Sequence, residues 1–368
     1  MLTAKRTAIA ALAAATASLA AVSPALAKTH QVHKGQSIQA AIDAAKPGDT
    51  IHVHKGTYKE YLTINKNGIK LIGTLARLVP AATAPTSSPC AAFTESGKAP
   101  GICVSGDATP STNGPPIVNS TVNGVRISGF VVKGFPADGV FNFAAKGTRA
   151  DHDAYLDNGG YGIFANTSSH TKLEESNSHG NADAGFYVGD SPNARAMVKN
   201  NDSTGNGDAG LLLRDASHGT VKGNHLHGNC AGIIVLADSP GPAGNWLLRN
   251  NRANGNNKEC PGSGPDSPAF SGIGIALLGA HDTTVRNNTV NGNTNANQSF
   301  VTGGIIVQKL SPTGTAPVHD VIRNNSAFSN KPFDISWDQT GSATFKKNHC
   351  GTSSPAGLCT KSKKGKKH

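Results

Sequence analysis

The sequence predicts an all-β protein folded as a single-stranded, right-handed parallel β-helix with a short N-terminal capping helix. Three observations lead to this prediction: a repeat of 22 to 25 residues, asparagines at fixed positions of that repeat, and 43 glycines with only 5% aromatic residues in a chain of 368. Such a repeat with short apolar strands is typical of stacked β-coils, in which each coil buries its apolar side chains against its neighbours.

Glycines anchor the repeat, because each precedes a short apolar strand such as Gly185-Phe-Tyr-Val or Gly210-Leu-Leu-Leu. The anchors lie at positions 139, 162, 185, 210 and 232, which are 23, 23, 25 and 22 residues apart. Later copies begin at Gly272 and Gly304, after longer gaps. Because side chains alternate along a strand, we expect the first and third residues after each glycine to point inward and the second outward.

A row of asparagines occupies one position of successive repeats, three residues after an apolar side chain. The row contains Asn201, Asn224, Asn251, Asn288, Asn325 and Asn348, and a second row five residues downstream includes Asn181, Asn206 and Asn229. Stacked coils would hold these side chains about 4.8 Å apart, so that their amides can hydrogen-bond along the stack while they are buried. We interpret both rows as structural.

Both ends of the chain have recognisable patterns. Residues 1–27 have the pattern of a signal peptide, with Lys5 and Arg6, an apolar run from Ala8 to Val22, and Ala25-Leu26-Ala27 before the expected cleavage point. The apolar run is too short for a membrane span and no later stretch approaches one, so we expect a secreted or wall-associated chain with no transmembrane segment after cleavage. Residues 356–368 form a basic tail that we expect to be disordered.

The β-helix domain is expected to span residues 28–355, with residues 28–48 as an N-terminal cap and residues 74–122 as an inserted, irregular segment. In the cap, Ser37 is a candidate helix N-cap, and an apolar stripe of Ile38, Ile42 and Ala45 follows it. A helix here would cover the open end of the stack, where strand edges are otherwise unpaired.

Six cysteines in a chain expected to be exported predict disulfides, and their spacing does not suggest a zinc site. Although six cysteines can pair in several ways, three pairs are close in sequence: Cys90 with Cys103, Cys230 with Cys260, and Cys350 with Cys359. Each disulfide would close a loop of modest length and stabilise the fold by roughly 2–4 kcal/mol.

Three N-terminal segments carry a family resemblance: Gln36-Ser-Ile-Gln-Ala-Ala-Ile42, Pro47-Gly-Asp-Thr-Ile-His-Val53 and Gly56-Thr-Tyr-Lys-Glu60. They resemble the N-terminus of the pectin-lyase-like β-helix superfamily. The downstream repeats are similar to its generic right-handed β-helix branch of exported bacterial proteins, which is related to copper-site maturation proteins and alginate epimerases. The resemblance covers about residues 35 to 350 and implies a fold more than an activity, because one fold carries many functions.

The outward residues that follow the glycines form an aromatic column. It contains Phe141, Phe164, Tyr187, Leu212, Ile234 and Ile306. Aromatic rings on successive coils can stack against the apolar faces of sugars, so Phe141, Phe164 and Tyr187 are candidate substrate-binding residues. The alternative is that a loop, or the segment 74–122, covers this column.

Asp183 and Asp208 lie two residues before their anchoring glycines, on adjacent coils. With Cα atoms about 5 Å apart, each carboxylate would raise the pKa of the other. The pair is a candidate for general acid–base catalysis or for a Ca²⁺ site, and Ca²⁺ is the only cofactor that the sequence suggests. Arg214, at the other end of these strands, is a candidate substrate-binding residue. Aspartates near strand ends are also ordinary turn residues.

Six cations form a basic column, which Asp151 and Glu174 precede. Its members are Lys199, Lys222, Arg249, Arg286, Arg323 and Lys346. Neighbouring like charges repel, and an acidic polymer would relieve that repulsion. Removing Lys5 and Arg6 lowers the formal net charge from +11 to +9, which still favours acidic partners. Lys199 and Lys222 are therefore candidate substrate-binding residues, unless the column only protects the sheet from aggregation.

Asp151-His152-Asp153 is a candidate catalytic tripeptide, because a histidine flanked by carboxylates can be kept basic for proton abstraction. It is similar to the Asp-Pro-His-Asp motif of alginate epimerases without the proline, and the resemblance implies catalytic roles for Asp151 and His152. However, Asp153 falls in the asparagine register, which would place the tripeptide on a different side of the coil.

Two functions stay open on these grounds. One is a secreted protein that binds an acidic polysaccharide, with cleavage or epimerisation as the reactions to test. The other is a non-catalytic, wall-associated or adhesive scaffold. Signatures of polygalacturonases, pectate lyases and pectin methylesterases are not found in their usual context, which weakens the prediction of an enzyme. Nucleic acid is a less favoured partner, because the basic column lacks interleaved aromatic residues.

Overall fold

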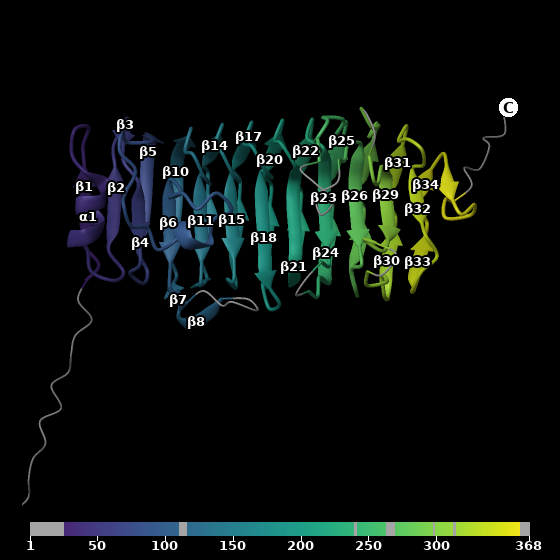
Figure 1. Cartoon of the computed structure of the whole chain (residues 1–368), viewed down its shortest axis with the longest axis horizontal. Helices are drawn as coiled ribbons and strands as arrows, with labels where there is room; N and C mark the ends of the chain where they lie inside the picture. Colours follow the sequence, from purple (N-terminus) through teal and green to yellow (C-terminus); the bar gives the residue numbers. More distant parts are fainter. Residues whose placement is uncertain are drawn as a thin grey trace, which may run out of the picture.

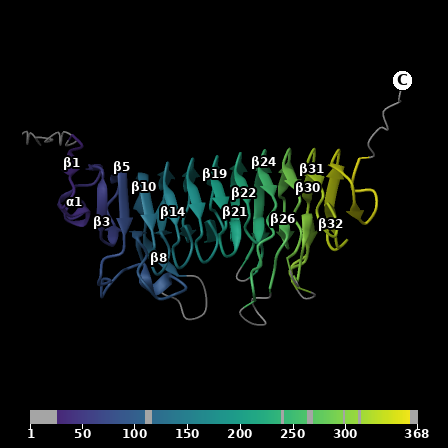
Figure 2. The same cartoon turned by 90° about the horizontal axis from the view of Figure 1, so that it is seen from above.

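The computed structural model of the chain describes residues 26–109, 116–238, 241–262, 269–296, 299–311 and 314–360. Its strands stack in parallel into a long β-helix, with helix α1 (Ile38–Ala44) at the N-terminal end (Figures 1 and 2). The predicted signal peptide lies outside the described residues except for Leu26 and Ala27, and residues 361–368 of the predicted basic tail also lie outside them.

The coils add strands to three faces, which we name first, second and third in the order in which the chain passes through them from β4 onward. The first face contains β4 (Leu62–Ile64), β6 (Ile102–Ser105), β11 (Val140–Phe143), β15 (Ile163–Asn166), β18 (Phe186–Ser191), β21 (Ala209–Lys222), β23 (Ala231–Leu236), β26 (Ile273–Leu278), β29 (Gly303–Gln308), β32 (Ile335–Trp337) and β35 (Ser353–Ser354).

Three long strands bend between faces, so that β5 and β10 run from the second face to the third and β21 runs from the first to the second. The second face contains β1 (Thr29–Val32), β2 (Thr50–Val53), β5 (Lys70–Val79), β10 (Arg126–Lys133), β13 (Arg149–Asp151), β16 (Lys172–Glu174), β19 (Ala196–Lys199), β24 (Gly244–Arg249), β27 (Thr284–Arg286), β30 (Asp320–Arg323) and β33 (Ala343–Lys346). The third face contains β3 (Gly56–Lys59), β14 (Ala154–Leu156), β17 (Asn177–His179), β20 (Asp202–Thr204), β22 (His225–His227), β25 (Arg252–Asn254), β28 (Thr289–Asn291), β31 (Ser326–Phe328) and β34 (His349–Cys350).

The core follows from the parallel register, which places equivalent residues directly above one another. On the first face Phe186 pairs with Leu211, and Leu211 with Ile233; all three are buried inside the coil. The next residues, Tyr187 and Leu212, are paired in the same way but belong to a separate cluster outside the coil. The predicted alternation of inward and outward side chains is therefore confirmed on this face.

The asparagine rows are continuous hydrogen-bonded ladders. In the first row the Asn201 side-chain amide donates to the Asn224 side-chain oxygen at 3.0 Å, and the same bond recurs on each coil as far as Asn348. The second row runs from Asn158 to Asn330, with amide–oxygen distances of 2.8–3.2 Å. Each side chain also caps backbone groups, so these buried amides are satisfied and their role is structural.

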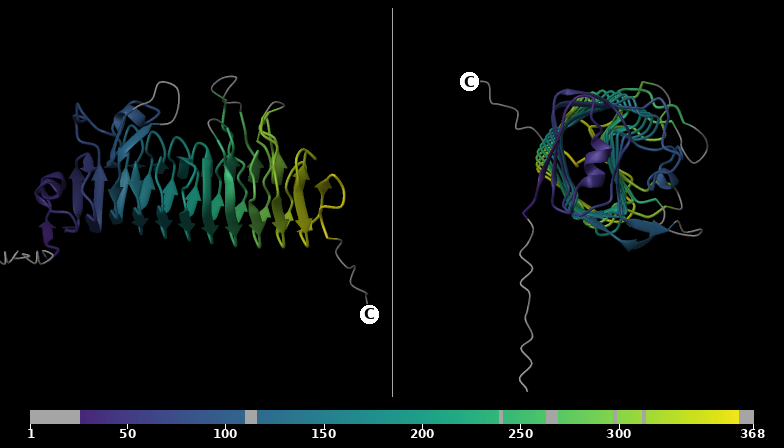
Figure 3. Two further views of the ribbon diagram at one scale, coloured as in Figure 1. Left: turned by 90° about the horizontal axis from the view of Figure 1, so that it is seen from below. Right: turned by 90° about the vertical axis from the view of Figure 1, so that its left-hand side faces the viewer.

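Helix α1 closes the N-terminal end of the stack, as Figure 3 shows in its right-hand view. The Ser37 hydroxyl accepts a hydrogen bond from the Ala40 backbone N–H at 3.1 Å, which is the expected N-cap geometry. Ile38 and Ile42 are buried against the first coils, so the predicted cap helix is present. In the described part of the chain, no helix is long and apolar enough to cross a membrane.

Loops project from one side of the stack in two groups, one at its N-terminal part and one at its C-terminal part (Figure 3, left). Within the expected irregular segment 74–122, β5 continues to Val79 and β6 joins the first face, while β7 (Asp107–Thr109) and β8 (Ile117–Ser120) form an antiparallel pair. β9 (Val122–Asn123) pairs with β12 (Ala145–Lys146), and a 3₁₀ turn covers Ala91–Phe93.

Three disulfides tie these loops and the last coil to the stack. They join Cys90 to Cys103, Cys230 to Cys260, and Cys350 to Cys359, with Cα–Cα distances of 5.8, 5.8 and 5.3 Å. These are the three pairs that are close in sequence, and among the described residues no cysteine is free.

Candidate functional site

The aromatic column faces outward from the coil as predicted, but its side chains are shielded from solvent. Phe141, Phe164 and Tyr187 are 0%, 3% and 2% exposed, so they do not form the expected platform for sugar rings. They pack on one another instead, with Phe164 and Tyr187 stacked at a ring separation of 4.3 Å and an interplanar angle of 7°. The prediction that these three rings bind substrate is therefore wrong for this structure, and the alternative of a cover is confirmed.

The two groups of loops provide that cover. Residues 80–101, which we call the first roof, bring Phe93 into a stack with Phe143 at 4.0 Å, and the Cys90–Cys103 disulfide joins the roof to β6. The described parts of three later loops form the second roof and contribute Phe270, Val301 and Leu310; they are residues 256–262, 269–272, 292–296, 299–302, 309–311 and 314–319. The least buried members of the column, Leu212 at 7% and Ile234 at 6%, lie on the coils between the two roofs.

An acidic cluster lies beside the buried column, at the leading end of the first-face strands. It consists of Asp183 and Asp208, which are half-buried, together with Asp138 and Glu95. Tyr161 lies among these carboxylates and donates a hydrogen bond from its hydroxyl to Glu95 Oε1 at 2.6 Å. Asp138 is 3% exposed; its Oδ1 accepts the Tyr161 backbone N–H at 2.9 Å, whereas its Oδ2 has no hydrogen-bond partner among the described residues.

Burial and repulsion from neighbouring carboxylates keep the three aspartates of this cluster partly protonated near neutral pH. Burial, with the charge of Glu95, raises the pKa of Asp183 to about 6. Burial, with the charge of Asp183, raises the pKa of Asp208 to about 7, and Asp138 reaches about 7 for similar reasons. Carboxyls that titrate in this range can both donate and accept protons at physiological pH, as a general acid–base pair must.

The sequence did not identify Asp138 and Glu95 as members of this cluster. Asp138 is one residue before its anchoring glycine, whereas Asp183 and Asp208 are two residues before theirs, so it is out of register with them. Glu95 comes from the first roof, which follows no repeat. Among the described residues, Asp183 and Asp208 belong to no group of three carboxylate, histidine or cysteine ligand atoms that all lie within 4.8 Å of one another, so the Ca²⁺ site stays a prediction without structural support.

Arg214 lies at the trailing end of the first-face strands, and its guanidinium already forms an ion pair. Its Nη2 is 2.7 Å from Asp238 Oδ2, and the side chain is 37% exposed. The neighbouring Asp215 is 1% exposed and accepts the Asp238 backbone N–H at 2.8 Å. Arg214 therefore orders a turn of the stack, and any role in binding substrate would require exchange of this ion pair.

Asp151 and His152 lie at the bend between the second and third faces, away from the acidic cluster. Asp151 is fully buried, and Arg126 donates to both of its oxygens at 2.9 and 2.8 Å. Burial opposes ionisation, but the hydrogen bonds from Arg126 and His152 outweigh it and lower the pKa of Asp151. The expectation that the tripeptide lies on another side of the coil is confirmed, because Asp153 occupies the buried bend position and accepts the Phe130 backbone N–H.

His152 is held between two carboxylates. Its Nδ1 is 3.0 Å from Asp151 Oδ2 and its Nε2 is 3.0 Å from Glu175 Oε2, while its side chain is 58% exposed. It lines a surface hollow of about 410 Å³ together with Gly73, Leu75, Gly129, Phe130, Val131, Asp153, Ala154, Glu175 and Asn177. This geometry orients the imidazole. To take a proton from a substrate, however, His152 would first have to break the contact between its Nε2 and Glu175.

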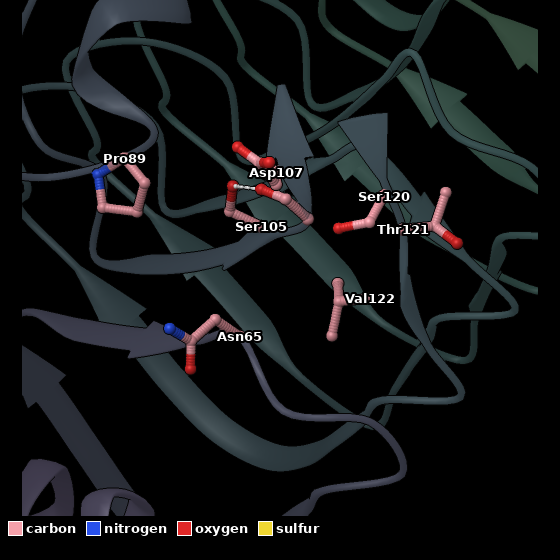
Figure 4. A pocket seen from close by; sticks show the side chains of 8 residues that line it. Asn65, Pro89, Ser105, Asp107, Ser120, Thr121 and Val122 are labelled. Carbon is pink, nitrogen blue, oxygen red and sulfur yellow. Dashed lines mark hydrogen bonds between the residues drawn. The ribbon is translucent and has the colours of Figure 1, made fainter. Parts of the chain in front are cut away.

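Another hollow, of about 290 Å³, lies beneath β7 and β8 (Figure 4). Hydroxyl and small side chains dominate its lining, and the Ser105 hydroxyl donates to the Gly106 carbonyl at 2.6 Å. The lining residues are Asn65, Pro89, Ser105, Gly106, Asp107, Ser120, Thr121 and Val122. With Asp107 as its one titratable group, this hollow does not contain an acid–base pair.

The basic column is a continuous row on the second face. Lys199 pairs with Lys222, and each later member pairs with the next as far as Lys346. Five of the six side chains are partly exposed and Lys346 is exposed. Within the described ranges none of the six forms an ion pair with a carboxylate. The column and the acidic cluster lie on different faces, so Lys199 and Lys222 are not brought together with Asp183 and Asp208.

Comparison with known proteins identifies the architecture. The family described as right-handed β-helix region matches residues 100–264 and 149–313. The fold is similar to that of the periplasmic alginate epimerase AlgG, with a TM-score of 0.56 and 15% identity over 88% of this chain and 73% of that one. It is also similar to the A-module of the mannuronan C-5 epimerase AlgE6 of Azotobacter vinelandii, with a TM-score of 0.57 and 14% identity over 86% and 89%.

At these identities the structural likeness establishes the fold alone. No curated protein sequence matches the chain. The family match spans more than half of the residues and coincides with the coils that carry the asparagine ladders. The chain belongs to the right-handed β-helix family.

Proposed function

We propose that this protein is exported and binds an acidic polysaccharide, and that the basic column on the second face is its binding surface. The single observation that carries the proposal is the row of six cations on consecutive coils, about 4.8 Å apart, none of which forms an ion pair with a described residue. A polymer with one negative charge per sugar can follow such a row and relieve the repulsion between its members.

Two further features support the proposal. Three disulfides are typical of proteins that fold in an oxidising compartment outside the cytoplasm, where acidic wall and matrix polymers are found. The structurally similar AlgG and AlgE6 are, by their names, epimerases of an acidic polysaccharide, so the same substrate class is the first to test.

Binding of polygalacturonate and alginate, with dextran as an uncharged control, tests the proposal. The variant Lys199→Glu/Lys222→Glu should weaken binding of the acidic polymers by about tenfold and flatten its salt dependence. The matched control, Lys55→Glu/Lys59→Glu, changes the net charge equally through exposed residues of the N-terminal coils. Equal affinity of the two variants would contradict a binding surface on the basic column.

If an acidic polysaccharide also reacts, the acidic cluster on the first face is the proposed catalytic site, and the reacting sugar would bind there rather than along the basic column of the second face. The proton on C5 of a uronate is acidic because it is next to the carboxyl group, and Asp183 and Asp208 are the pair that would remove and return protons. Breaking of the C4–O glycosidic bond in the resulting anion forms the C4–C5 double bond, and the departing oxygen takes a proton from the protonated aspartic acid. Reprotonation of C5 on the opposite face gives the epimer instead. Because the two pKa values are about 6 and about 7, activity should be greatest between them.

Incubation with alginate and pectate tests this step by the absorbance of unsaturated uronates and by NMR of uronate stereochemistry. Asp183→Asn or Asp208→Asn should lower turnover about a hundredfold, because each removes one member of the proton-transfer pair. Asp157→Asn, which changes an exposed aspartate of the same stack, should leave turnover intact. Turnover that survives both cluster variants would rule out the acidic cluster and direct attention to His152.

The second candidate function is a non-catalytic, wall-associated or adhesive scaffold. The roofs over the aromatic column favour it, since they remove the sugar-stacking platform that the sequence suggested. Binding of acidic polymers without turnover on a broad panel would select this function and leave the proposal for the basic column unchanged.

A further inference from the structure

A group of two histidines and one aspartate on the third face belongs to none of the sites described above. Asp202 lies on β20 and pairs directly with His225 on β22, and His227 follows two residues later on the same strand. Residues two apart on a strand point to the same side, so His225, His227 and Asp202 converge on one patch of the outer surface. Among the described residues this is the one group of three whose ligand atoms lie within 4.8 Å of one another.

The distances suit a small divalent ion. His225 Nδ1 is 3.2 Å from Asp202 Oδ2, and His227 Nε2 is 3.5 Å from Asp202 Oδ1. Two ligands bound to Zn²⁺ at about 2.0–2.1 Å in tetrahedral geometry are themselves about 3.3 Å apart. The present contacts therefore hold each histidine nitrogen at about the distance from the Asp202 carboxylate that a shared ion requires, and the ligand atoms of all three residues lie within 4.8 Å of one another.

The surroundings orient the ligands. The Thr204 hydroxyl is 3.3 Å from His227 Nδ1, which leaves Nε2 directed at Asp202. The two imidazoles stack at a centroid distance of 4.4 Å with an interplanar angle of 27°. A hydrogen bond to the ring nitrogen that does not bind the metal, like that between Thr204 and His227 Nδ1, fixes the orientation of metal-binding histidines. The three side chains are 38–46% exposed, so an ion can reach them without a change in the fold.

We propose that Asp202, His225 and His227 bind a late first-row divalent metal ion, with Zn²⁺ as the best match. Two imidazoles and one carboxylate are ligands that Zn²⁺ prefers, and three protein ligands leave a fourth position for water or another oxygen donor. A mixed nitrogen–oxygen set is unsuited to Ca²⁺, which takes six to eight oxygen ligands. Arg252 is in register with His225 on the next coil, and its positive charge should weaken binding of a cation.

A calorimetric titration of the purified chain with Zn²⁺ tests the proposal. In a parallel titration with Co²⁺, the visible absorption spectrum reports the coordination of the ion. We expect one ion per chain at this site, a Co²⁺ spectrum of low-coordinate type that Zn²⁺ abolishes, and no displacement by excess Ca²⁺. His225→Ala/His227→Ala should weaken binding about tenfold or more and remove the Co²⁺ bands. Arg252→Ala should tighten binding.

The matched control is His179→Ala, which removes an exposed histidine of the same face, in register with Thr204, that is not a member of the group. It should bind Zn²⁺ as the unchanged chain does. Unaltered Zn²⁺ affinity and Co²⁺ bands in the double variant would overturn the proposal, as would equal losses in the double variant and the control. Circular dichroism establishes that each variant keeps its fold.

Discussion

The bend between the second and third faces and the outer side of the first face are built from the same repeat, yet they differ in what determines them. At the bend, the side chains of Asn201, Asn224 and Asn251 hydrogen-bond to their equivalents on adjacent coils and to the backbone that they cap. On the first face, the outward side chains are covered by loops that follow no repeat. Nearest-neighbour stacking therefore determines the scaffold, whereas long loops determine which of its surfaces are accessible.

Asn251→Ala should have the largest effect on stability. Asn251 Oδ1 accepts both the backbone N–H and the side-chain amide of Asn224, at 3.0 and 2.9 Å, inside the stack. Leaving two buried donors without an acceptor should lower the free energy of unfolding by about 4 kcal/mol. Chemical denaturation measures this. The control Asn177→Ala removes an exposed side chain of β17 and should change stability by less than about 0.5 kcal/mol.

Removal of the Cys90–Cys103 disulfide tests the first roof. The double variant Cys90→Ala/Cys103→Ala should lose about 3 kcal/mol, because the cross-link restricts the unfolded chain. It should also bind a hydrophobic dye, since the disulfide holds the roof over Phe141 and Phe143. Cys350→Ala/Cys359→Ala removes a disulfide at the other end of the stack and should not increase dye binding; equal dye binding by both would show that the roof does not depend on its disulfide.

The acidic cluster should make stability depend on pH in a defined direction. The raised pKa values of Asp138, Asp183 and Asp208 mean that the folded chain binds more protons than the unfolded chain between about pH 4 and 7. Their contribution is complete below the unfolded pKa and is lost as pH rises through about 6–7. Asp138→Asn should therefore stabilise the protein by on the order of 1–2 kcal/mol more at pH 8 than at pH 5.

Thermal unfolding at both pH values measures this difference, with Asp157→Asn as a control for an exposed aspartate. If stability depends on pH in Asp138→Asn as it does in the unchanged chain, then Asp138 is ionised in the folded state and its Oδ2 is hydrogen-bonded.

His152→Asn should have the smallest effect. His152 has a positive φ of 59°, and asparagines occupy the same bend position with positive φ in later coils, as at Asn200 and Asn250. Asparagine tolerates this conformation, the exposed contact between His152 and Glu175 adds little stability, and Asp151 keeps both hydrogen bonds from Arg126 when the imidazole is lost. We expect a change below about 0.5 kcal/mol by denaturation; a loss of more than 1 kcal/mol would mean that the two carboxylates depend on the imidazole.

The sequence was sufficient to predict features set by stacking. The parallel coils, the asparagine ladder through Asn251, the outward direction of Tyr187 and the row through Lys199 all follow from one period and from strand alternation. The three disulfides followed from proximity along the chain.

The rest depended on contacts that no repeat encodes. Glu95 reaches the acidic cluster from an irregular roof, and Phe93 covers the aromatic column from the same segment. The separation of Lys199 from Asp183 required knowledge of where each coil bends, which the period alone does not give. The proposed metal ligands were also missed, because Asp202 lies on one coil and both histidines, His225 and His227, lie on the next.

Lysine labelling in the presence of polygalacturonate tests the central claim most directly. Mass spectrometry measures the extent of acetylation at each lysine with and without the polymer. Lys199, Lys222 and Lys346 report on the basic column, and Lys55 and Lys59 are internal references. The account predicts that the polymer protects Lys199, Lys222 and Lys346 and leaves the references reactive. Uniform protection of all five lysines, or protection of the references alone, would contradict a binding surface on the second face.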